Sequence, residues 1–115
     1  MKPNIIKEKS FVFAVEIVNM FKELVAEKKE YVMSRQLLKS GTSIGANVRE
    51  AEFAQSKSDF ISKMSISLKE ANETDYWLDL LHATVFLETE KFKKYKPKSQ
   101  EMLRLLVSIV KTSKQ

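Results

Sequence analysis

The stretch from residue 91 to residue 98 combines positive charge with aromatic rings. Five lysines alternate with Phe92 and Tyr95, and Pro97 precedes the last of the five. Ammonium groups attract phosphates, and aromatic rings can stack on unpaired bases. Lysine lacks the planar fork with which arginine reads base edges, so the predicted binding to nucleic acid is mostly independent of sequence. The alternative is that both rings fold back over the end of the protein while the lysines are solvated.

A second set of basic side chains lies upstream of this stretch. Arg35 and Lys39 are four residues apart on one predicted helix face, and Arg49 follows more loosely. In an oligomer, the charges of several copies add to one positive field. The alternative for Arg49 is an ion pair with Glu50 or Glu52. The residues predicted to bind nucleic acid are Arg35, Lys39, Arg49, Lys91, Lys93, Lys94, Lys96 and Lys98.

Uncharged and acidic polar side chains also recur at helical spacing. Ser43, Asn47 and Glu50 share one helix face, and Glu70 and Glu73 lie on the next predicted helix. Polar groups that are buried need hydrogen-bond partners. These five residues therefore predict a polar network between helices, within one bundle or between copies, that fixes the register. A ligand site is the less favoured interpretation.

The residue inventory argues against catalysis and against a metal site. The chain has one histidine, His82, and no cysteine. A di-metal bundle needs two Glu-x-x-His pairs and two further acids, and here only Asp79 and His82 have that spacing. A Ser-His-Asp triad would lack a glycine elbow. We expect no enzymatic activity, no metal and no cofactor, with His82 as a hydrogen-bonded structural histidine.

Both glycines of the chain, Gly41 and Gly45, fall inside a segment that otherwise has a helical pattern. Glycine inside a helix costs about 1 kcal/mol relative to alanine, so its use here needs a reason. Without a Cβ at these positions, another backbone or a bulky side chain can approach closely. The sequence therefore predicts a tight helix contact at this turn.

The apolar periodicity defines four helices joined by short connections. The first stripe is Phe13, Ile17, Met20 and Leu24, and the second helix repeats Leu37, Gly41, Ile44, Val48 and Ala51. Capping serines are expected at Ser34, at Ser56 or Ser58, and at Ser99, because a hydroxyl can accept a hydrogen bond from an unpaired N–H. The predicted helices span about residues 4–28, 34–55, 58–88 and 99–113, with a loop over residues 90–98 that Pro97 enforces. The predicted fold is all-α, an antiparallel up-and-down four-helix bundle forming a single domain over residues 1–115.

Composition adds three expectations. Residues 91–115 hold eight Lys or Arg and one Glu, whereas residues 1–90 hold twelve basic and fourteen acidic residues, so the net charge of +5 is a C-terminal property that suggests an anionic partner. The absence of cysteine, of a signal-peptide pattern and of an apolar run of about 20 residues favours a cytoplasmic protein that does not enter a membrane. The apolar stripes of the first and last helices are broader than one bundle needs, which predicts self-association.

Two segments carry a resemblance to a known family. The segments 43–51 (SIGANVREA) and 67–78 (SLKEANETDYWL), in this order and at this separation, resemble the four-helix proteins encoded in intervening sequences of bacterial 23S ribosomal RNA genes. That family is in turn similar to the accessory variability determinant of diversity-generating retroelements, a basic homopentamer of four-helix protomers that binds nucleic acid and a reverse transcriptase. The resemblance implies a four-helix fold and a homopentameric ring.

Together these features predict a non-enzymatic, homo-oligomeric accessory protein that binds nucleic acid, either RNA or an RNA–DNA hybrid, on a multivalent basic surface. The alternative is an interaction scaffold whose basic surface docks an acidic protein such as a polymerase or reverse transcriptase. Binding to random RNA that weakens with salt would distinguish the first function from the second.

Overall fold

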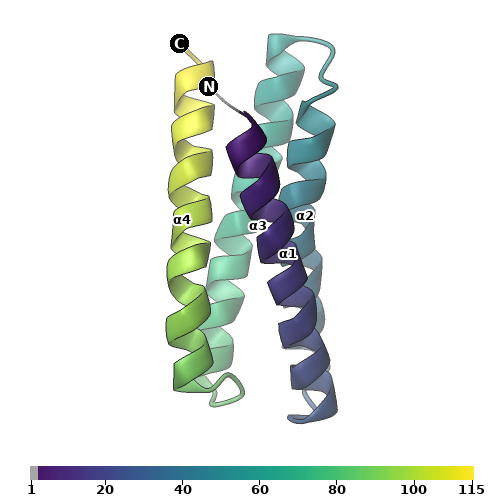
Figure 1. The fold of residues 1–115 in the computed structure, drawn as a ribbon, viewed down its shortest axis with the longest axis vertical. Helices are drawn as coiled ribbons and strands as arrows, with labels where there is room; N and C mark the ends of the chain where they lie inside the picture. The colour runs from purple at the N-terminus through teal and green to yellow at the C-terminus, as the bar shows by residue number, and fades with distance from the viewer. Residues whose placement is uncertain (1–2) are drawn as a thin grey trace.

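The computed structural model describes residues 3–115, and the side chains from residue 5 onward. This part of the chain forms four helices and no strand: α1 (Pro3–Ala26), α2 (Met33–Ala51), α3 (Lys57–Ala83) and α4 (Thr89–Ser113). Each helix runs antiparallel to the one before it, and the chain returns at three short turns (Figure 1). The result is a rod of about 44 × 20 × 19 Å. The predicted all-α class with four helices is confirmed.

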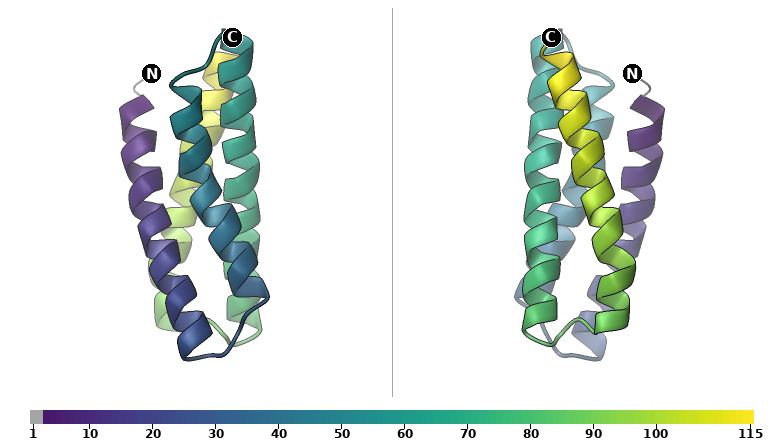
Figure 2. Two further views of the ribbon diagram at one scale, coloured as in Figure 1. Left: turned by 90° about the vertical axis from the view of Figure 1, so that its right-hand side faces the viewer. Right: turned by 90° about the vertical axis from the view of Figure 1, so that its left-hand side faces the viewer.

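Sequential helices are neighbours in this rod. Helix α2 packs between α1 and α3, α3 packs between α2 and α4, and α1 and α4 form the loosest of the four side-by-side contacts. The two further views show α1 standing apart from α4 toward the N-terminus (Figure 2). Helices α2 and α4 therefore lie on one diagonal of the bundle and point their outer faces in opposite directions.

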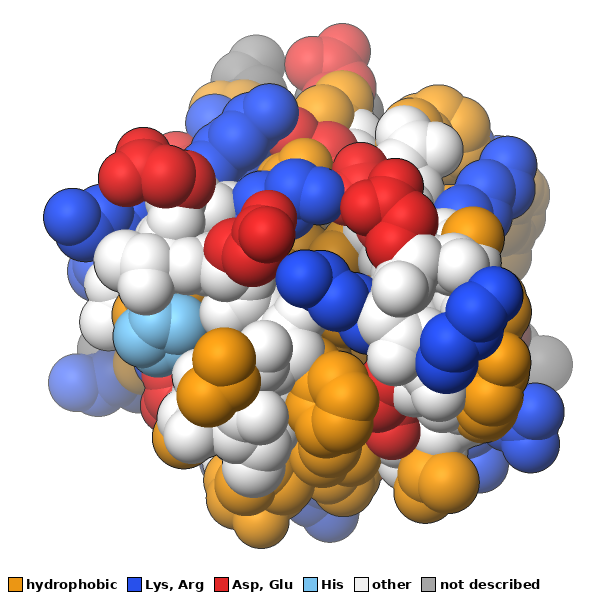
Figure 3. Space-filling view, turned by 90° about the horizontal axis from the view of Figure 1, so that it is seen from below, with side chains coloured by type: hydrophobic (Ala, Val, Ile, Leu, Met, Phe, Trp, Pro, Cys, Tyr) orange, Lys and Arg blue, Asp and Glu red, His pale blue; other side chains and the backbone are white. Residues whose placement is uncertain are grey.

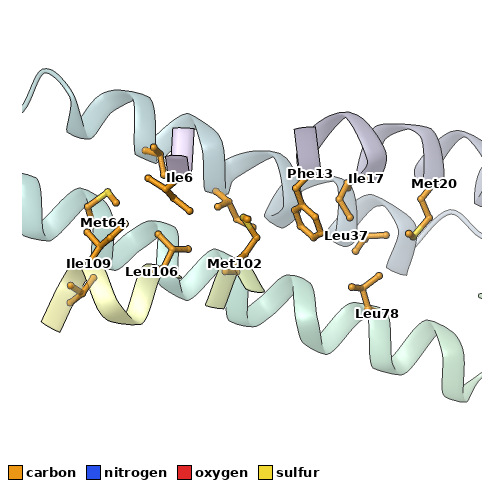
Figure 4. Close-up of a cluster of buried hydrophobic side chains, with 14 of the residues drawn as sticks. Ile6, Phe13, Ile17, Met20, Leu37, Met64, Leu78, Met102, Leu106 and Ile109 are labelled. Atoms are coloured by element: carbon orange, nitrogen blue, oxygen red, sulfur yellow. The ribbon is translucent and has the colours of Figure 1, made fainter. Parts of the chain in front are cut away.

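Each of the four helices contributes one buried row of apolar side chains to the core, as the apolar periodicity requires. All four residues of the α1 stripe (Phe13, Ile17, Met20, Leu24) are buried, and so is the predicted α2 seam. Farther along the same core, Met64 of α3 lies close to Leu106 and Ile109 of α4, and Leu78 of α3 lies close to Leu37 of α2 (Figure 4). The hydrophobic seams predicted for the first two helices are confirmed.

The two glycines of α2 mark the place where α1 comes closest. A Cβ at Gly41 would lie 2.8 Å from Cγ2 of Ile17, nearer than real side chains approach. A Cβ at Gly45 would lie 3.3 Å from the hydroxyl oxygen of Ser10, which is a tight but less severe contact. The predicted close approach is confirmed, with Ile17 as the bulky group at Gly41.

The boundary between the last two helices differs from the predicted one. Helix α3 ends at Ala83 rather than near residue 88, and α4 begins at Thr89 rather than at Ser99. Pro97 lies inside α4, so the predicted loop over residues 90–98 is wrong. The ring of Pro97 removes one backbone hydrogen bond. Ser99 is buried and donates instead to the Asp75 carboxylate at 2.9 Å, which ties α4 to α3.

Capping at the first turn of α2 also differs from the prediction, whereas at α3 it agrees. The Glu30 carboxylate, not the Ser34 hydroxyl, accepts hydrogen bonds from the N–H groups of Val32, Met33 and Ser34, at 3.1, 3.0 and 2.7 Å. Burial opposes the charge on Glu30, but these backbone donors outweigh it and hold its pKa below the usual value. At α3, Ser56 accepts from the Asp59 N–H at 3.0 Å, which confirms one of the two predicted caps.

Candidate nucleic-acid interface

The five lysines of residues 91–98 lie on the first turns of α4 and divide into two groups. Three are paired with acids from other helices: Lys91 with Glu23, Lys98 with Glu16, and Lys96 with two aspartates of α3. The charge of each of these ammonium groups is compensated by carboxylates of the same copy, at the surface for Lys91 and Lys98 and in a more enclosed position for Lys96. Lys93 and Lys94 are exposed and take part in none of the ion pairs among residues 3–115.

Lys96 is the most enclosed of the five. Its ammonium group lies 2.7 Å from the Asp75 carboxylate and 2.8 Å from that of Asp79. Desolvation alone would lower the pKa of Lys96, but the two carboxylates outweigh it and raise that pKa above its usual value. The side chain thus joins α3 to α4 as a fixed cation, and its predicted role in binding nucleic acid has no support in this geometry.

The aromatic rings of the same segment face the bundle. Phe92 stacks on His82 with 4.0 Å between ring centroids, and Tyr95 is partly buried against the core. The alternative interpretation, in which these rings fold back onto the protein, describes both residues. His82 also lies 3.2 Å from the Thr89 hydroxyl, as expected of a structural histidine.

Helix α4 carries further basic residues beyond those predicted to bind nucleic acid. Arg104, Lys111 and Lys114 are exposed, and none takes part in the ion pairs among the described residues. We call the set they form with two upstream lysines the α4 basic face. Its members are Lys93, Lys94, Arg104, Lys111 and Lys114.

Three members of this face line up along the helix. Lys93, Arg104 and Lys111 are separated by 11 and 7 residues, which is about three and about two helical turns. Of the two acids of α4, Glu90 is exposed and unpaired among the described residues, whereas Glu101 is half-buried and paired with Lys9. The excess of positive charge near the C-terminus, combined with helical spacing, was the signal that could have identified this face.

The basic residues of α2 lie on the opposite side of the rod. Arg35, Lys39 and Arg49 are all exposed. The guanidinium of Arg49 lies over the Phe11 ring at 5.5 Å from the centroid. Within one copy Glu50 pairs with Lys63 and Glu52 with Lys7, so Arg49 pairs with neither acid there.

The predicted polar network does not form between helices of one copy. Ser43 donates to the Lys39 carbonyl and Asn47 to the Ser43 carbonyl, both within α2, and Glu73 accepts from the Trp77 ring N–H within α3. Burial, with Glu73 nearby, raises the pKa of Glu70 against the influence of Lys39. Among the described residues no hydrogen bond joins two of the five predicted side chains. A network between copies stays a prediction.

Hydroxyl groups outside these five residues do connect the helices. The Thr74 hydroxyl of α3 donates to that of Ser40 of α2 at 2.9 Å, and Ser67 donates to the Ile44 carbonyl at 2.9 Å. All three of these side chains are completely buried. Small hydroxyl residues within an apolar stripe at helix spacing were the available signal.

Helix α1 leaves much of its apolar surface uncovered. Ile5, Phe11, Val12 and Val15 are between 46% and 57% exposed. Ile5, Val12 and Phe13 also line a groove of about 530 Å³ between α1 and α4, together with charged residues of both helices. The broad apolar arc predicted for the first helix is thus present at the surface, whereas on α4 only Val107 is comparably exposed.

The end of the rod that carries the α1–α2 and α3–α4 turns has no uniform charge. Basic and acidic side chains lie next to one another there, with hydrophobic side chains between them (Figure 3). Lys28 pairs with Glu88 at this end. The two helix faces, rather than the end of the bundle, are therefore the candidate interfaces.

Residues 3–115 support neither a metal site nor a membrane-spanning helix. No group of three or more His, Cys, Asp or Glu side chains there could hold a metal ion. None of the described helices is both long enough and apolar enough to cross a membrane.

Comparison with known proteins adds a family to this architecture. The family model described as 23S rRNA-intervening sequence protein matches residues 2–108. A crystal structure from Bacteroides thetaiotaomicron, described as a protein of unknown function from the S23 ribosomal protein family, is 58% identical in sequence with a TM-score of 0.93. That match covers 96% of this chain and 99% of the other. No significant match is found among curated proteins.

Neither description names an enzymatic activity. The family model spans nearly the whole bundle, from the start of α1 into the last turns of α4, and so takes in both segments that carry the resemblance. The chain therefore belongs to the 23S rRNA-intervening sequence protein family.

Proposed function

We propose that this protein is a non-enzymatic accessory protein of the cytoplasm that binds RNA as a homo-oligomer, with the α4 basic face as the contact surface. The observation that carries the proposal is the row of exposed Lys and Arg side chains along α4 that take part in none of the ion pairs among residues 3–115. The family description, which refers to ribosomal RNA, favours RNA as the polyanion.

Lack of an ion-pair partner matters because binding to phosphate depends on it. A lysine that already pairs with a carboxylate must lose that partner before it can neutralise a phosphate. Lys93, Arg104 and Lys111 have no ion-pair partner to lose, so they can displace the counterions condensed on a nucleic acid. Such contacts recognise the backbone and carry no base specificity of their own.

The two predicted basic surfaces are not equivalent. On α2, Arg49 already contacts the Phe11 ring and Lys39 lies near the carboxylate of Glu70. On α4, the row extends over about five turns with one exposed acid, Glu90, at its start. We therefore place the principal contact on α4, and we keep Arg35, Lys39 and Arg49 as a second surface on the other side of the rod.

Self-association would multiply this charge. The exposed apolar residues of α1 are the surface that a second copy would cover, because water-exposed valine and isoleucine side chains favour burial. A homopentamer, as the family resemblance implies, would repeat the net charge of +5 five times. Long-range attraction and multivalency would then strengthen an individually weak contact.

The test is a filter-binding titration with single-stranded and structured RNA at about 50 mM and about 200 mM salt. The variant K93Q/R104Q/K111Q removes three charges from α4, and R35Q/K39Q/R49Q removes three from α2 as the matched control. We expect binding that weakens steeply with salt. A plot of the logarithm of the binding constant against the logarithm of the salt concentration has a negative slope. We expect the α4 variant to make that slope less negative by about 2 to 3, as the loss of three phosphate contacts predicts.

Each other outcome has a defined meaning. A larger effect of the α2 variant would move the principal contact to that face. No binding at low salt, or binding without salt dependence, would rule out the phosphate mechanism and favour docking of an acidic protein.

A further inference from the structure

Three charges of the α4 basic face lie along a straight line at fixed separations. Lys93, Arg104 and Lys111 project from one side of a single helix, about 16 Å and then about 10 Å apart along its axis. Their helix is held against α3 by the Lys96 ion pairs and by the hydrogen bond from Ser99 to Asp75. The charges therefore occupy set positions along a line, whereas charges on a flexible loop could adapt to any chain.

No aromatic side chain is exposed on this face. Phe92 and Tyr95, the two aromatic residues of α4, are half-buried against the core, and the ammonium group of Lys94 lies over the remaining side of the Tyr95 ring at 5.3 Å from its centroid. The exposed uncharged residues between the charges are Pro97, Gln100, Val107, Ser108 and Thr112. Proteins that bind single strands use aromatic rings as platforms on which the bases stack, and each base contributes about 1–3 kcal/mol. A surface without such platforms has little to offer an unpaired base.

The polar side chains between the charges suit a different ligand. Gln100 and Ser108 are exposed, flank Arg104 along the helix and can donate or accept hydrogen bonds. The minor groove of an A-form duplex is wide and shallow, has phosphates along both edges and displays 2′-hydroxyl groups. A helix laid against such a groove brings basic side chains to the phosphates and polar side chains to the hydroxyl groups.

We infer that the α4 basic face binds double-stranded RNA, recognised by its A-form shape, in preference to single-stranded RNA or duplex DNA. This inference rests on the proposed function and narrows it to one class of ligand. Lys93, Lys94, Arg104, Lys111 and Lys114 contact phosphates, and Gln100 and Ser108 contact 2′-hydroxyl groups.

The α2 face provides an internal contrast. There the exposed Phe11 ring lies beside Arg49, so a base could stack on the free side of that ring. If single strands are the true ligand, this is the face that should hold them. The variant F11A thus reports on the competing mode and leaves α4 intact.

Fluorescence anisotropy with the full chain can separate the possibilities. The probes are an RNA duplex of about 16 base pairs, one of its strands alone, and a DNA duplex of the same sequence. We expect the RNA duplex to bind at least about tenfold more tightly than either other probe at about 100 mM salt. K93Q/R104Q/K111Q should remove that preference, the charge-retaining K93R/R104K/K111R should keep it, and F11A should leave duplex binding unchanged.

The variant Q100A/S108A tests the hydroxyl contacts separately. It should narrow the difference between the RNA and DNA duplexes without changing the salt dependence, because it removes no charge. Equal or tighter binding of the single strand, above all if F11A weakens it, would overturn the duplex inference and leave RNA binding standing. Absence of binding to every RNA probe would instead overturn the proposed function itself.

Discussion

At the scale of single residues, Gly41 sets the distance between α1 and α2. A Cβ there would lie 2.8 and 2.9 Å from two carbons of Ile17, which is completely buried. Overpacking of this kind typically costs 1–3 kcal/mol, whereas alanine gains about 1 kcal/mol in helix propensity. We expect Gly41→Ala to lower the free energy of unfolding by about 1 kcal/mol, measured by urea denaturation.

Gly45→Ala is the matched control. Its Cβ would meet only the Ser10 hydroxyl at 3.3 Å and backbone atoms at 3.5 Å, so the gain in helix propensity should nearly balance the contact. An equal loss of stability in both variants would contradict the assignment of Gly41 as the closest contact.

Glu30 makes stability depend on pH through the first turn of α2. Its pKa is lowered from 4.5 because three N–H groups hydrogen-bond the carboxylate and outweigh the effect of burial. A carboxyl group with a lowered pKa contributes stability above its unfolded pKa and loses that contribution as the pH falls through the folded pKa. We expect Glu30→Gln to lose about 1 kcal/mol at pH 7, as typical caps do.

The same variant gives the pH test. The difference in unfolding free energy between Glu30→Gln and the unmodified protein should shrink as the pH is lowered from about 5 to about 3, because both side chains are then neutral. Glu8 is exposed and makes none of the ion pairs among residues 3–115, so Glu8→Gln is the control. A difference that does not change with pH would show that the charge of Glu30 is not what caps the helix.

At the scale of elements, the turn after α3 contains a strained residue. Val85 has φ of 70°, a left-handed conformation that branched side chains rarely adopt, and it is 82% exposed. Its N–H bonds to the His82 carbonyl, and the Phe86 N–H bonds to the Leu81 carbonyl. This is the pattern with which helices end at a glycine. Because glycine adopts this conformation without strain, we expect Val85→Gly to raise the melting temperature and to add about 1 kcal/mol of stability.

Val107→Gly serves as the control for that substitution, since Val107 is also exposed but lies within α4. It should destabilise by about 1 kcal/mol, as glycine does inside a helix. Destabilisation by Val85→Gly as well would mean that the valine side chain itself supports the turn.

The sequence predicted the helices well where apolar periodicity alone decides, and poorly at the turn between α3 and α4. The stop at Ala83 was missed because Val85 occupies the position where glycine would have marked the end. The start at Thr89 was missed because Pro97 suggested a loop, whereas contacts of Ser99 and Lys96 with Asp75 support the helix through it. Those contacts join residues more than 20 positions apart, so no local pattern reveals them.

The candidate site shows the same limit. The lysines of residues 91–98 were identified from their number, but the acids that neutralise Lys91 and Lys98, Glu23 and Glu16, lie on α1. Only the folded chain brings these partners together. Arg104 and Lys111, by contrast, could have been predicted, because an exposed helix face follows from spacing alone.

At the scale of the whole molecule, the exposed face of α1 predicts association. Val12 and Val15 are 57% and 46% exposed, so Val12→Lys with Val15→Lys removes apolar surface without opening the core. If copies bury this face, light scattering should change from an oligomer to a 13.3 kDa monomer while the helical circular dichroism is kept. Val32→Lys, at a 73% exposed position in the connection between α1 and α2, should leave the mass of the oligomer unchanged. A monomeric unmodified protein at micromolar concentration would refute the association.

The attachment of α4 through Lys96 has a mechanical consequence. Asp75 and Asp79 of α3 both form ion pairs with the ammonium group of Lys96. Lys96 directly precedes Pro97, which lacks the N–H for a backbone hydrogen bond within the helix. The Lys96 ion pairs thus stabilise the helix beside the missing hydrogen bond. They keep Lys93 and Lys111 about 27 Å apart along the helix axis. A rigid ligand whose phosphates match this spacing would lose little conformational entropy on binding. A flexible ligand would lose more, because it would have to be ordered first.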